Sequence, residues 1–226
     1  MTAKLDLSQP RLMGILNVTP DSFSDGGKFI NLDKALVHAL AMLDQGADII
    51  DIGGESTRPG ALRVSAKEQK ERTGGIIEAI ASKRPDALMS IDTTSVEVAE
   101  CALDAGVGML NDISAARDDP AMLELAAKRN IPICLMHIQG TPQTMQDNPH
   151  YEDVVSEVCS FLSERVAIAI KCGVSKRNII VDPGIGFGKT TEHNLALIAN
   201  LNRIVCLLYT SPSPRDRTRS RMPSSA

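Results

Sequence analysis

Polar side chains stand at the ends of six short apolar runs in this sequence. They are carboxylates, amides and an imidazole, at positions Asn17, Asp51, Asp92, Asn111, His137 and Asp182. Asp and Asn often cap helices at such junctions, but capping does not explain the two long glycine-rich loops after the first two runs. Because carboxylates accept N–H donors and an amide both donates and accepts, the pattern predicts a site for the amino-pyrimidinone edge of a pterin or guanine-like ring.

The first two loops also favour a phosphate-bearing ligand and a metal ion. Thr57, Arg58 and the neighbouring glycines supply donors for an anion. Asn17 offers a neutral oxygen that suits Mg²⁺, a cation that keeps most of its waters and binds the phosphates of a substrate. Asn17 is therefore a candidate Mg²⁺ ligand.

The segment 184–190, Gly-Ile-Gly-Phe-Gly-Lys-Thr, is not a nucleotide-binding motif. A P-loop needs glycine at position 183, which is Pro183, and a dinucleotide fingerprint needs glycine or alanine at position 189, which is Lys189. The four histidines lack HxH and HExxH spacing, which argues against a zinc hydrolase.

Short apolar runs alternate with amphipathic helices along the chain. The expected strands are 12–18, 47–52, 87–91, 108–110, 131–136 and 178–181, and the expected helices include 32–45, 96–105, 121–129 and 149–172. Left-handed residues are expected after these helices, at Gly46, Gly106, Asn130 and Gly173. Ser65 with Glu68, and Thr94 with Glu97, have the spacing of capping boxes.

This alternation predicts a parallel sheet with right-handed crossovers. An open doubly wound sheet and a TIM (β/α)₈ barrel both satisfy it. Six units of about 32 residues extrapolate to about 265 residues for eight, close to the usual size of such a barrel. The expected fold is therefore an α/β TIM barrel, incomplete here at about six βα units.

The alternation of apolar runs and helices stops after about residue 204. Residues 205–226 have no helical or strand period and are rich in Ser, Pro and Arg. They are interpreted either as a disordered extension or as foreign sequence joined to a shortened frame, and the abrupt change favours the second. The expected domains are 1–204, a partial barrel, and 205–226, a disordered and non-native tail.

Composition excludes several classes of function. A net charge of −4, 3% aromatic residues and no Trp argue against a nucleic-acid partner. There is no signal-peptide core and no run of 18 apolar residues, so no membrane association is expected. Five cysteines without a CxxC pair are typical of small core residues in a reducing compartment, and the cytoplasm is the expected location.

Six motifs together resemble the dihydropteroate synthase family, at 14–27, 51–61, 90–103, 111–115, 136–146 and 182–198. The resemblance implies a TIM barrel in folate biosynthesis. The implied reaction condenses p-aminobenzoate with 6-hydroxymethyl-7,8-dihydropterin pyrophosphate and releases pyrophosphate. The implied cofactor is Mg²⁺, and a homodimer is usual in the family.

The resemblance also implies roles for individual residues. Asp92 and Arg58 would be catalytic, with Asp92 stabilising a pterin-methyl cation after pyrophosphate leaves. Asn17 would bind Mg²⁺. The implied substrate-binding residues are Asp92, Asn111 and Asp182 for the pterin, Thr57 and Pro59 in the second loop, and Phe23 and Phe187 near p-aminobenzoate.

Two family motifs have no match in this sequence: a Ser-Arg-Lys-Ser type motif after strand 7 and an Arg-x-His motif on strand 8. A polypeptide of these 226 residues is therefore expected not to catalyse the reaction. Two alternatives stay open: a pterin-binding methyltransferase domain, which shares the barrel and carboxylate pocket, and a catalytically inactive pterin binder.

Overall fold

The structure is a computed structural model that describes residues 5, 8–19, 28–58 and 60–208. Within these residues it contains one parallel sheet with the strand order β1-β2-β3-β4-β5-β6. The strands are β1 (Met13–Asn17), β2 (Ile49–Gly53), β3 (Leu88–Asp92), β4 (Met109–Asp112), β5 (Ile133–Met136) and β6 (Ile179–Asp182).

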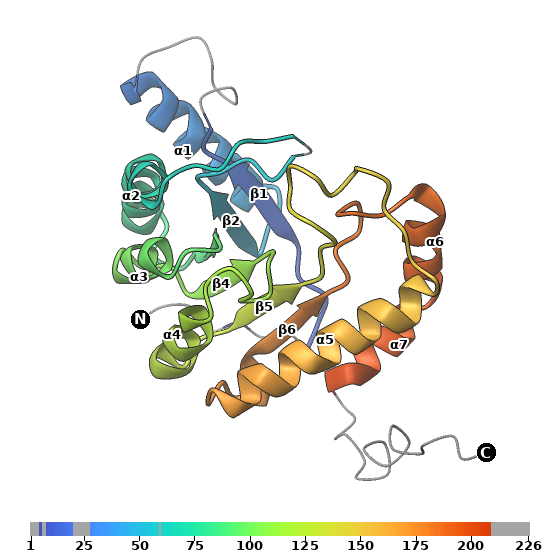
Figure 1. Cartoon of the computed structure of the whole chain (residues 1–226). Coiled ribbons are helices and arrows are strands. Elements are labelled where there is room, and N and C mark those ends of the chain that lie inside the picture. The colour runs from blue at the N-terminus through green and yellow to red at the C-terminus, as the bar shows by residue number, and fades with distance from the viewer. Residues whose placement is uncertain (1–4, 6–7, 20–27, 59, 209–226) are drawn as a thin grey trace, which may run out of the picture.

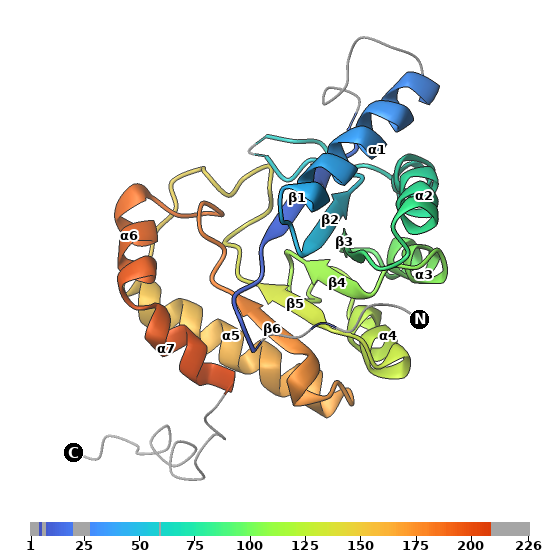
Figure 2. The ribbon, with the colours of Figure 1, turned by 180° about the vertical axis from the view of Figure 1, so that it is seen from behind.

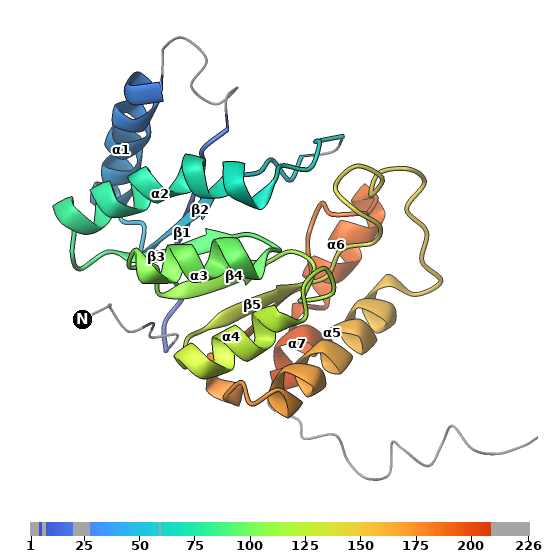
Figure 3. The same cartoon turned by 60° about the vertical axis from the view of Figure 1, so that its left-hand side comes forward.

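Helices connect the strands and cover the outer side of the curved sheet (Figures 1 and 2). They are α1 (Lys28–Asp44), α2 (Ala66–Lys83), α3 (Val96–Asp104), α4 (Ala121–Arg129), α5 (Val154–Lys171), α6 (Thr191–Ala199) and α7 (Leu201–Val205). Figure 3 shows α1 to α5 following one another around the sheet in chain order. No pairing joins β1 to β6 in the described residues, so the expectation of an incomplete barrel of six βα units is confirmed.

Alternating side chains of the strands face the helices and form the main core. Ile50 and Ile52 of β2 are fully buried together with Ala35 of α1 and Ile76 of α2. Burying one such isoleucine contributes about 1.5–3 kcal/mol. The strand residues that alternate with these buried ones face the barrel interior. Ile15 of β1 is one of them, and it is 64% exposed because the sheet has an open edge there.

Most of the expected helix ends are correct. Ser65 accepts from the Glu68 backbone N–H, and Asn130 has a left-handed φ of 52°. The prediction of a capping box at Thr94 is wrong. Helix α3 begins after Ser95, and the Val96 N–H donates to the Asp119 side chain at 3.0 Å.

The expected helix start at residue 149 is also wrong, since α5 begins at Val154 with Asp153 as its cap. The segment before it is turned inward, where the buried Tyr151 hydroxyl donates to the Gly188 carbonyl.

The C-terminal part of the described chain continues past residue 204. Helix α7 ends at Val205, a short 3₁₀ turn covers Cys206–Leu208, and the buried Ile204 packs in a cluster with Val158 and Leu162. Residues 209–226 lie outside the described residues, so the domain boundary stays a prediction. Among the helices described, none combines the length and hydropathy needed to cross a membrane.

Candidate active site

The carboxyl ends of the strands bring inward-facing polar residues to one level. Asn17 is the register partner of Gly53, Gly53 of Asp92, and Asp92 of Asn111. One layer deeper, Asp51 is the partner of Ser90. Because residues at the same level of a parallel sheet share a face, these side chains converge at the mouth of the partial barrel.

Asp51 holds the deeper layer together. This nearly fully buried carboxylate accepts from the Ser90 hydroxyl and, at 2.8 Å, from Asn111 Nδ2. The Asn111 amide group is thereby oriented, which leaves its carbonyl oxygen to accept from a ligand. Burial raises the pKa of Asp51, although both hydrogen bonds oppose this.

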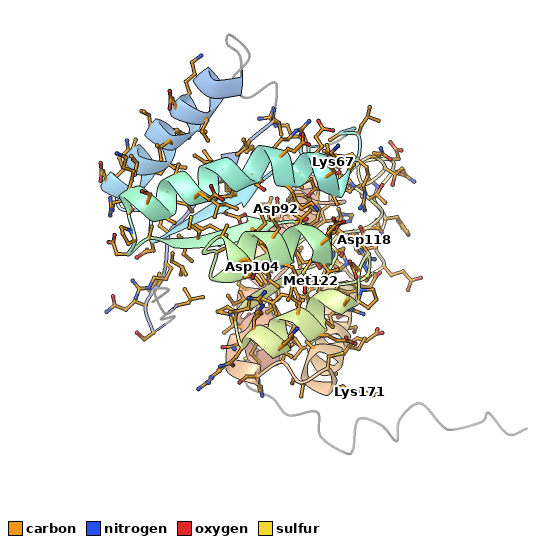
Figure 4. All side chains as sticks on the ribbon, turned by 90° about the vertical axis from the view of Figure 1, so that its left-hand side faces the viewer. Lys67, Asp92, Asp104, Asp118, Met122 and Lys171 are labelled. Carbon is orange, nitrogen blue, oxygen red and sulfur yellow. The ribbon has the colours of Figure 1, made fainter. Side chains whose placement is uncertain are left out.

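Asp92 lies above this layer without such partners. No group in the described part of the chain donates a hydrogen bond to its carboxyl. Desolvation, followed by the negative charges of Asp51, Asp112 and Glu55, raises the pKa of Asp92 well above 3.8. Figure 4 labels Asp92 behind the ribbons of α2 and α3, on their inner side. A ligand with N–H groups or positive charge would lower the cost of ionising this carboxyl.

Gly53 keeps the space between Asn17 and Asp92 open. A Cβ at Gly53 would lie 3.3 Å from Asn17 Oδ1 and 3.5 Å from Asp92 Oδ2. Both oxygens therefore border the same small volume.

Asp182 approaches from the other side of the mouth. It ends β6 as the partner of Met136, and its Oδ1 accepts from the Gly184 N–H at 2.7 Å. The buried Cys134 thiol, on the strand between, has a pKa raised by burial and then by Asp182, Asp51, Asp112 and Asp92. Cys134 is the register partner of Asn111, and Met136, two residues later on the same face of β5, is the partner of Asp182, so Asp182 faces the same side of the sheet as Asn111. Asp182 is separated from Asn111 by β5, so the three predicted pterin residues do not lie on consecutive strands.

Phe187 follows Asp182 in the loop after β6. It packs on an apolar cluster at the barrel mouth formed by Ile113, Met136, Ile138 and Met145. Met136 of this cluster is the register partner of Asp182, so the apolar cluster borders the polar strand ends.

The loop after β2 reaches across the mouth. The Gly60 N–H donates to the Pro142 carbonyl at 3.2 Å, which joins this loop to the one after β5 (Figure 1). Arg58 is exposed and Thr57 half-buried, and among the described residues no hydrogen bond or ion pair joins either side chain to Asp92. Phe23 and Pro59 lie outside the described residues.

A divalent cation would find few protein ligands at this mouth. Asn17 supplies one neutral oxygen, and among the described residues no three His, Cys, Asp or Glu side chains converge on a common point. This donor set fits an ion that takes most of its ligands from phosphate and water, which is the preference of Mg²⁺.

Comparison with known proteins identifies the family. The model of the pterin binding enzyme family matches residues 13–211. The chain belongs to this family. The dihydropteroate synthase of Haemophilus influenzae is 48% identical over 205 residues, which cover 91% of this chain and 74% of that protein. The Escherichia coli enzyme is 48% identical over 87% of this chain and 69% of its own length.

Solved structures of the same family are similar to this chain. A Xanthomonas albilineans dihydropteroate synthase with 4-aminobenzoic acid has a TM-score of 0.81 and 46% identity, over 88% of this chain and 70% of that one. The same enzyme with 7,8-dihydropteroate has a TM-score of 0.78 and 41% identity, over 90% and 71%. The resemblance to dihydropteroate synthase, a transferase of folate biosynthesis with a TIM-barrel fold, is confirmed. These relatives favour it over the methyltransferase alternative.

The sequence assigns no role of their own to Asp51 and Lys189. It marks Asp51 as one of six polar strand ends, whereas the structure places it inside β2, where it accepts a hydrogen bond from Asn111. A lone carboxylate within the apolar run 49–53 indicates a buried charge, and a buried charge must have hydrogen-bond partners. This pattern could have predicted the role of Asp51. Lys189 was considered only as a failed nucleotide motif, and no local pattern indicates its buried contacts.

Proposed function

We propose that the mouth of the partial barrel binds the pterin ring of 6-hydroxymethyl-7,8-dihydropterin pyrophosphate. The observation that supports this most is the Asp92 carboxyl, which lacks a hydrogen-bond donor in the described chain and stands beside the oriented carbonyl of Asn111. A half-buried acceptor without a donor costs free energy, and a ring N–H would remove that cost. Asp182 would accept from further ring donors on the opposite side.

The same carboxyl would assist the condensation. When the C–O bond to pyrophosphate breaks, positive charge develops on the pterin methylene, and the Asp92 carboxylate would stabilise it from the end of β3. The aniline nitrogen of p-aminobenzoate would then form the new C–N bond, and one of its N–H protons would pass to water. We place that second substrate against Phe187, with Phe23 and Pro59 as further expected contacts.

Thr57 and Arg58 would bind the pyrophosphate, together with Asn17 and its metal. Bound Mg²⁺ would neutralise charge on the leaving group. Asn17 would hold the ion through its side-chain oxygen, and Arg58 would act by swinging its exposed guanidinium toward the phosphates. We therefore expect this chain to bind Mg²⁺ only together with pyrophosphate or the substrate. The homodimer and the cytoplasmic location implied by the resemblance also stay predictions.

Calorimetry of the dihydropterin pyrophosphate with Mg²⁺ tests the pocket. Asp182→Ala should weaken binding at least tenfold, because ring donors would lose their acceptor in a buried site. Asp104→Asn is the matched control: this exposed carboxylate of α3 pairs with Arg129 and is labelled in Figure 4. It should leave affinity unchanged. Equal affinity in Asp182→Ala and the control would contradict the proposal.

Catalysis needs a separate test. The edge strands β1 and β6 are unpaired with each other, and the inward Ile15 is largely exposed. We expect a polypeptide of the printed 226 residues to form no more than a trace of dihydropteroate. A chimera that continues residue 204 with the last βα units of the Haemophilus influenzae enzyme should be active. Comparable rates for the two polypeptides would show that the open barrel suffices.

A further inference from the structure

Lys189 is the most completely bonded ionisable side chain near the mouth. Its ammonium group is 2.9 Å from the Gly184 carbonyl, 2.9 Å from the Phe187 carbonyl and 3.0 Å from His137 Nδ1. The His137 carbonyl is a weaker fourth acceptor at 3.3 Å. The residue is 3% exposed, so this charge is held inside the protein by acceptors of two different loops.

The protonation states fit this arrangement. Desolvation lowers the pKa of Lys189 to about 8, which leaves it charged at neutral pH, and the nearby Asp182 opposes the shift. Desolvation and then the charges of Lys189 and Arg117 lower the pKa of His137 to about 3. A neutral His137 ring can accept at Nδ1, and its proton then lies on Nε2.

The two loops are in close backbone contact at the same place. A Cβ at Gly184 would lie 1.9 Å from the His137 carbonyl oxygen, and one at Gly188 would lie 2.7 Å from that of Gln139. Gly184 and Gly188 also have φ values of 67° and 66°. The loop after β6 is thus shaped to lie flat on the loop after β5, with the lysine ammonium bridging them.

We infer that Lys189 is a positioning residue, which clamps the loop after β6 onto the loop after β5 and so fixes Asp182 and Phe187 for their substrates. The inference rests on the proposed function, because it gives Asp182 and Phe187 a purpose. Gly184 connects the parts: its N–H holds the Asp182 carboxylate, and its carbonyl accepts from Lys189. The Phe187 carbonyl accepts from the same ammonium, which fixes the backbone that carries the ring.

The test uses Lys189→Met, which keeps the side-chain length but removes every donor. Lys189→Arg is the second variant, because a planar guanidinium cannot direct its donors to acceptors grouped around one nitrogen. Lys171→Met, an exposed lysine at the end of α5 (Figure 4), is the control. Amide hydrogen exchange reports on the loop, and calorimetry with the dihydropterin pyrophosphate and Mg²⁺ reports on binding.

In both Lys189 variants we expect the Gly184 and Phe187 amides to exchange at least tenfold faster, while amides of β2 and β3 keep their rates. Pterin affinity should fall at least tenfold, and the control should match the wild type. The His137 ring should also lose the nitrogen chemical shifts of a hydrogen-bonded Nδ1 acceptor.

Two results would overturn the inference. One is unchanged exchange at Gly184 and Phe187 in both variants. The other is a loosened loop with wild-type affinity, while Asp182→Asn loses binding. If Asp182→Asn binds as tightly as the wild type, the proposed role of Asp182 fails instead, and the exchange rates alone decide whether the clamp exists.

Discussion

Two ionisable groups inside the barrel mouth have opposite surroundings. Asp92 accepts no hydrogen bond from the described chain and is surrounded by other acids, whereas the Lys189 ammonium has acceptors for all of its protons. Lys189 is buried and Asp92 is half-buried, and withdrawing either charge from water costs free energy. Hydrogen bonds within the protein offset this cost for the lysine, so its charge serves the structure. The aspartate has no such bonds in the described chain, so its charge is available to a ligand.

This contrast separates binding groups from supporting groups without reference to any relative. Asp51 is a supporting group like Lys189, because both of its hydrogen bonds are made within the protein and orient Asn111. Asn17 is a binding group like Asp92, since both border the space that Gly53 leaves open. The predictions below test this division, from the largest expected effect to the smallest.

Asp92→Asn should separate function from stability. In an active chimera it should reduce the condensation rate about 10²–10³-fold, since a fixed charge opposite the developing cation is lost. The free protein should become more stable by about 1 kcal/mol at pH 7.5, because a half-buried charge that accepts no hydrogen bond from the described residues is removed. Steady-state kinetics and denaturant unfolding measure the two effects.

The pH dependence of that stability gain follows from the raised pKa. The unfolded chain releases the Asp92 proton above pH 3.8, and the folded chain retains it to higher pH, so the stability of the wild type falls as pH rises through this window. The gain in Asp92→Asn should therefore vanish below pH 3.8. A destabilised variant at pH 7.5 would mean that Asp92 has an internal partner.

Asp51→Asn should act through its neighbours. The Asn111 amide would lose a charged acceptor, and we expect pterin affinity to fall about tenfold. Removing the Asp51 charge should also lower the pKa of Asp92, which moves the pH dependence of pterin binding to lower pH. Calorimetry over a pH series measures both effects. Reduced affinity with an unmoved pH profile would mean that the Asp51 charge does not influence Asp92.

Gly53→Ala should have the smallest effect. Its Cβ would stand 3.3–3.5 Å from Asn17 Oδ1 and Asp92 Oδ2, which is tight but tolerable for side-chain atoms. We expect a loss of pterin affinity of about two- to fivefold with little change in stability. Gly74→Ala is the control, because a Cβ there meets no atom within 4 Å. Equal affinity in both variants would show that the ligand does not enter this space.

The sequence predicted the fold well because its signals are local. Alternation of apolar runs with capped helices determines a parallel α/β sheet, and left-handed ends at Gly46 and Asn130 mark where helices stop. The start of α5 had a local signal in Asp153, which precedes an apolar run and caps the helix. The inward turn of Tyr151 to meet Gly188, which lies 37 residues away, had none.

The residues of the site also divide into those that local sequence signals predict and those that they do not. Asp92, Asn111 and Asp182 were predictable because each stands at the carboxyl end of a strand: Asp92 and Asp182 are the last residues of β3 and β6, and Asn111 is the last but one of β4. The bond from Asn111 to Asp51 and the bridge from Lys189 to His137 join residues 60 and 52 positions apart. They depend on strand register and on loop contact, which no local pattern in one sequence contains.

The central claim is that Asp92 is a half-buried acid whose carboxyl accepts no hydrogen bond from the described residues and is available to the pterin. A carbon-13 NMR titration of its side-chain carboxyl, with and without the dihydropterin pyrophosphate, tests this most directly. We predict a pKa well above 3.8 in the free protein and a lower pKa when the ligand is bound, because ring donors would stabilise the ionised form. An Asp92 that titrates at or below 3.8 in the free protein, or does not respond to the ligand, would contradict the account.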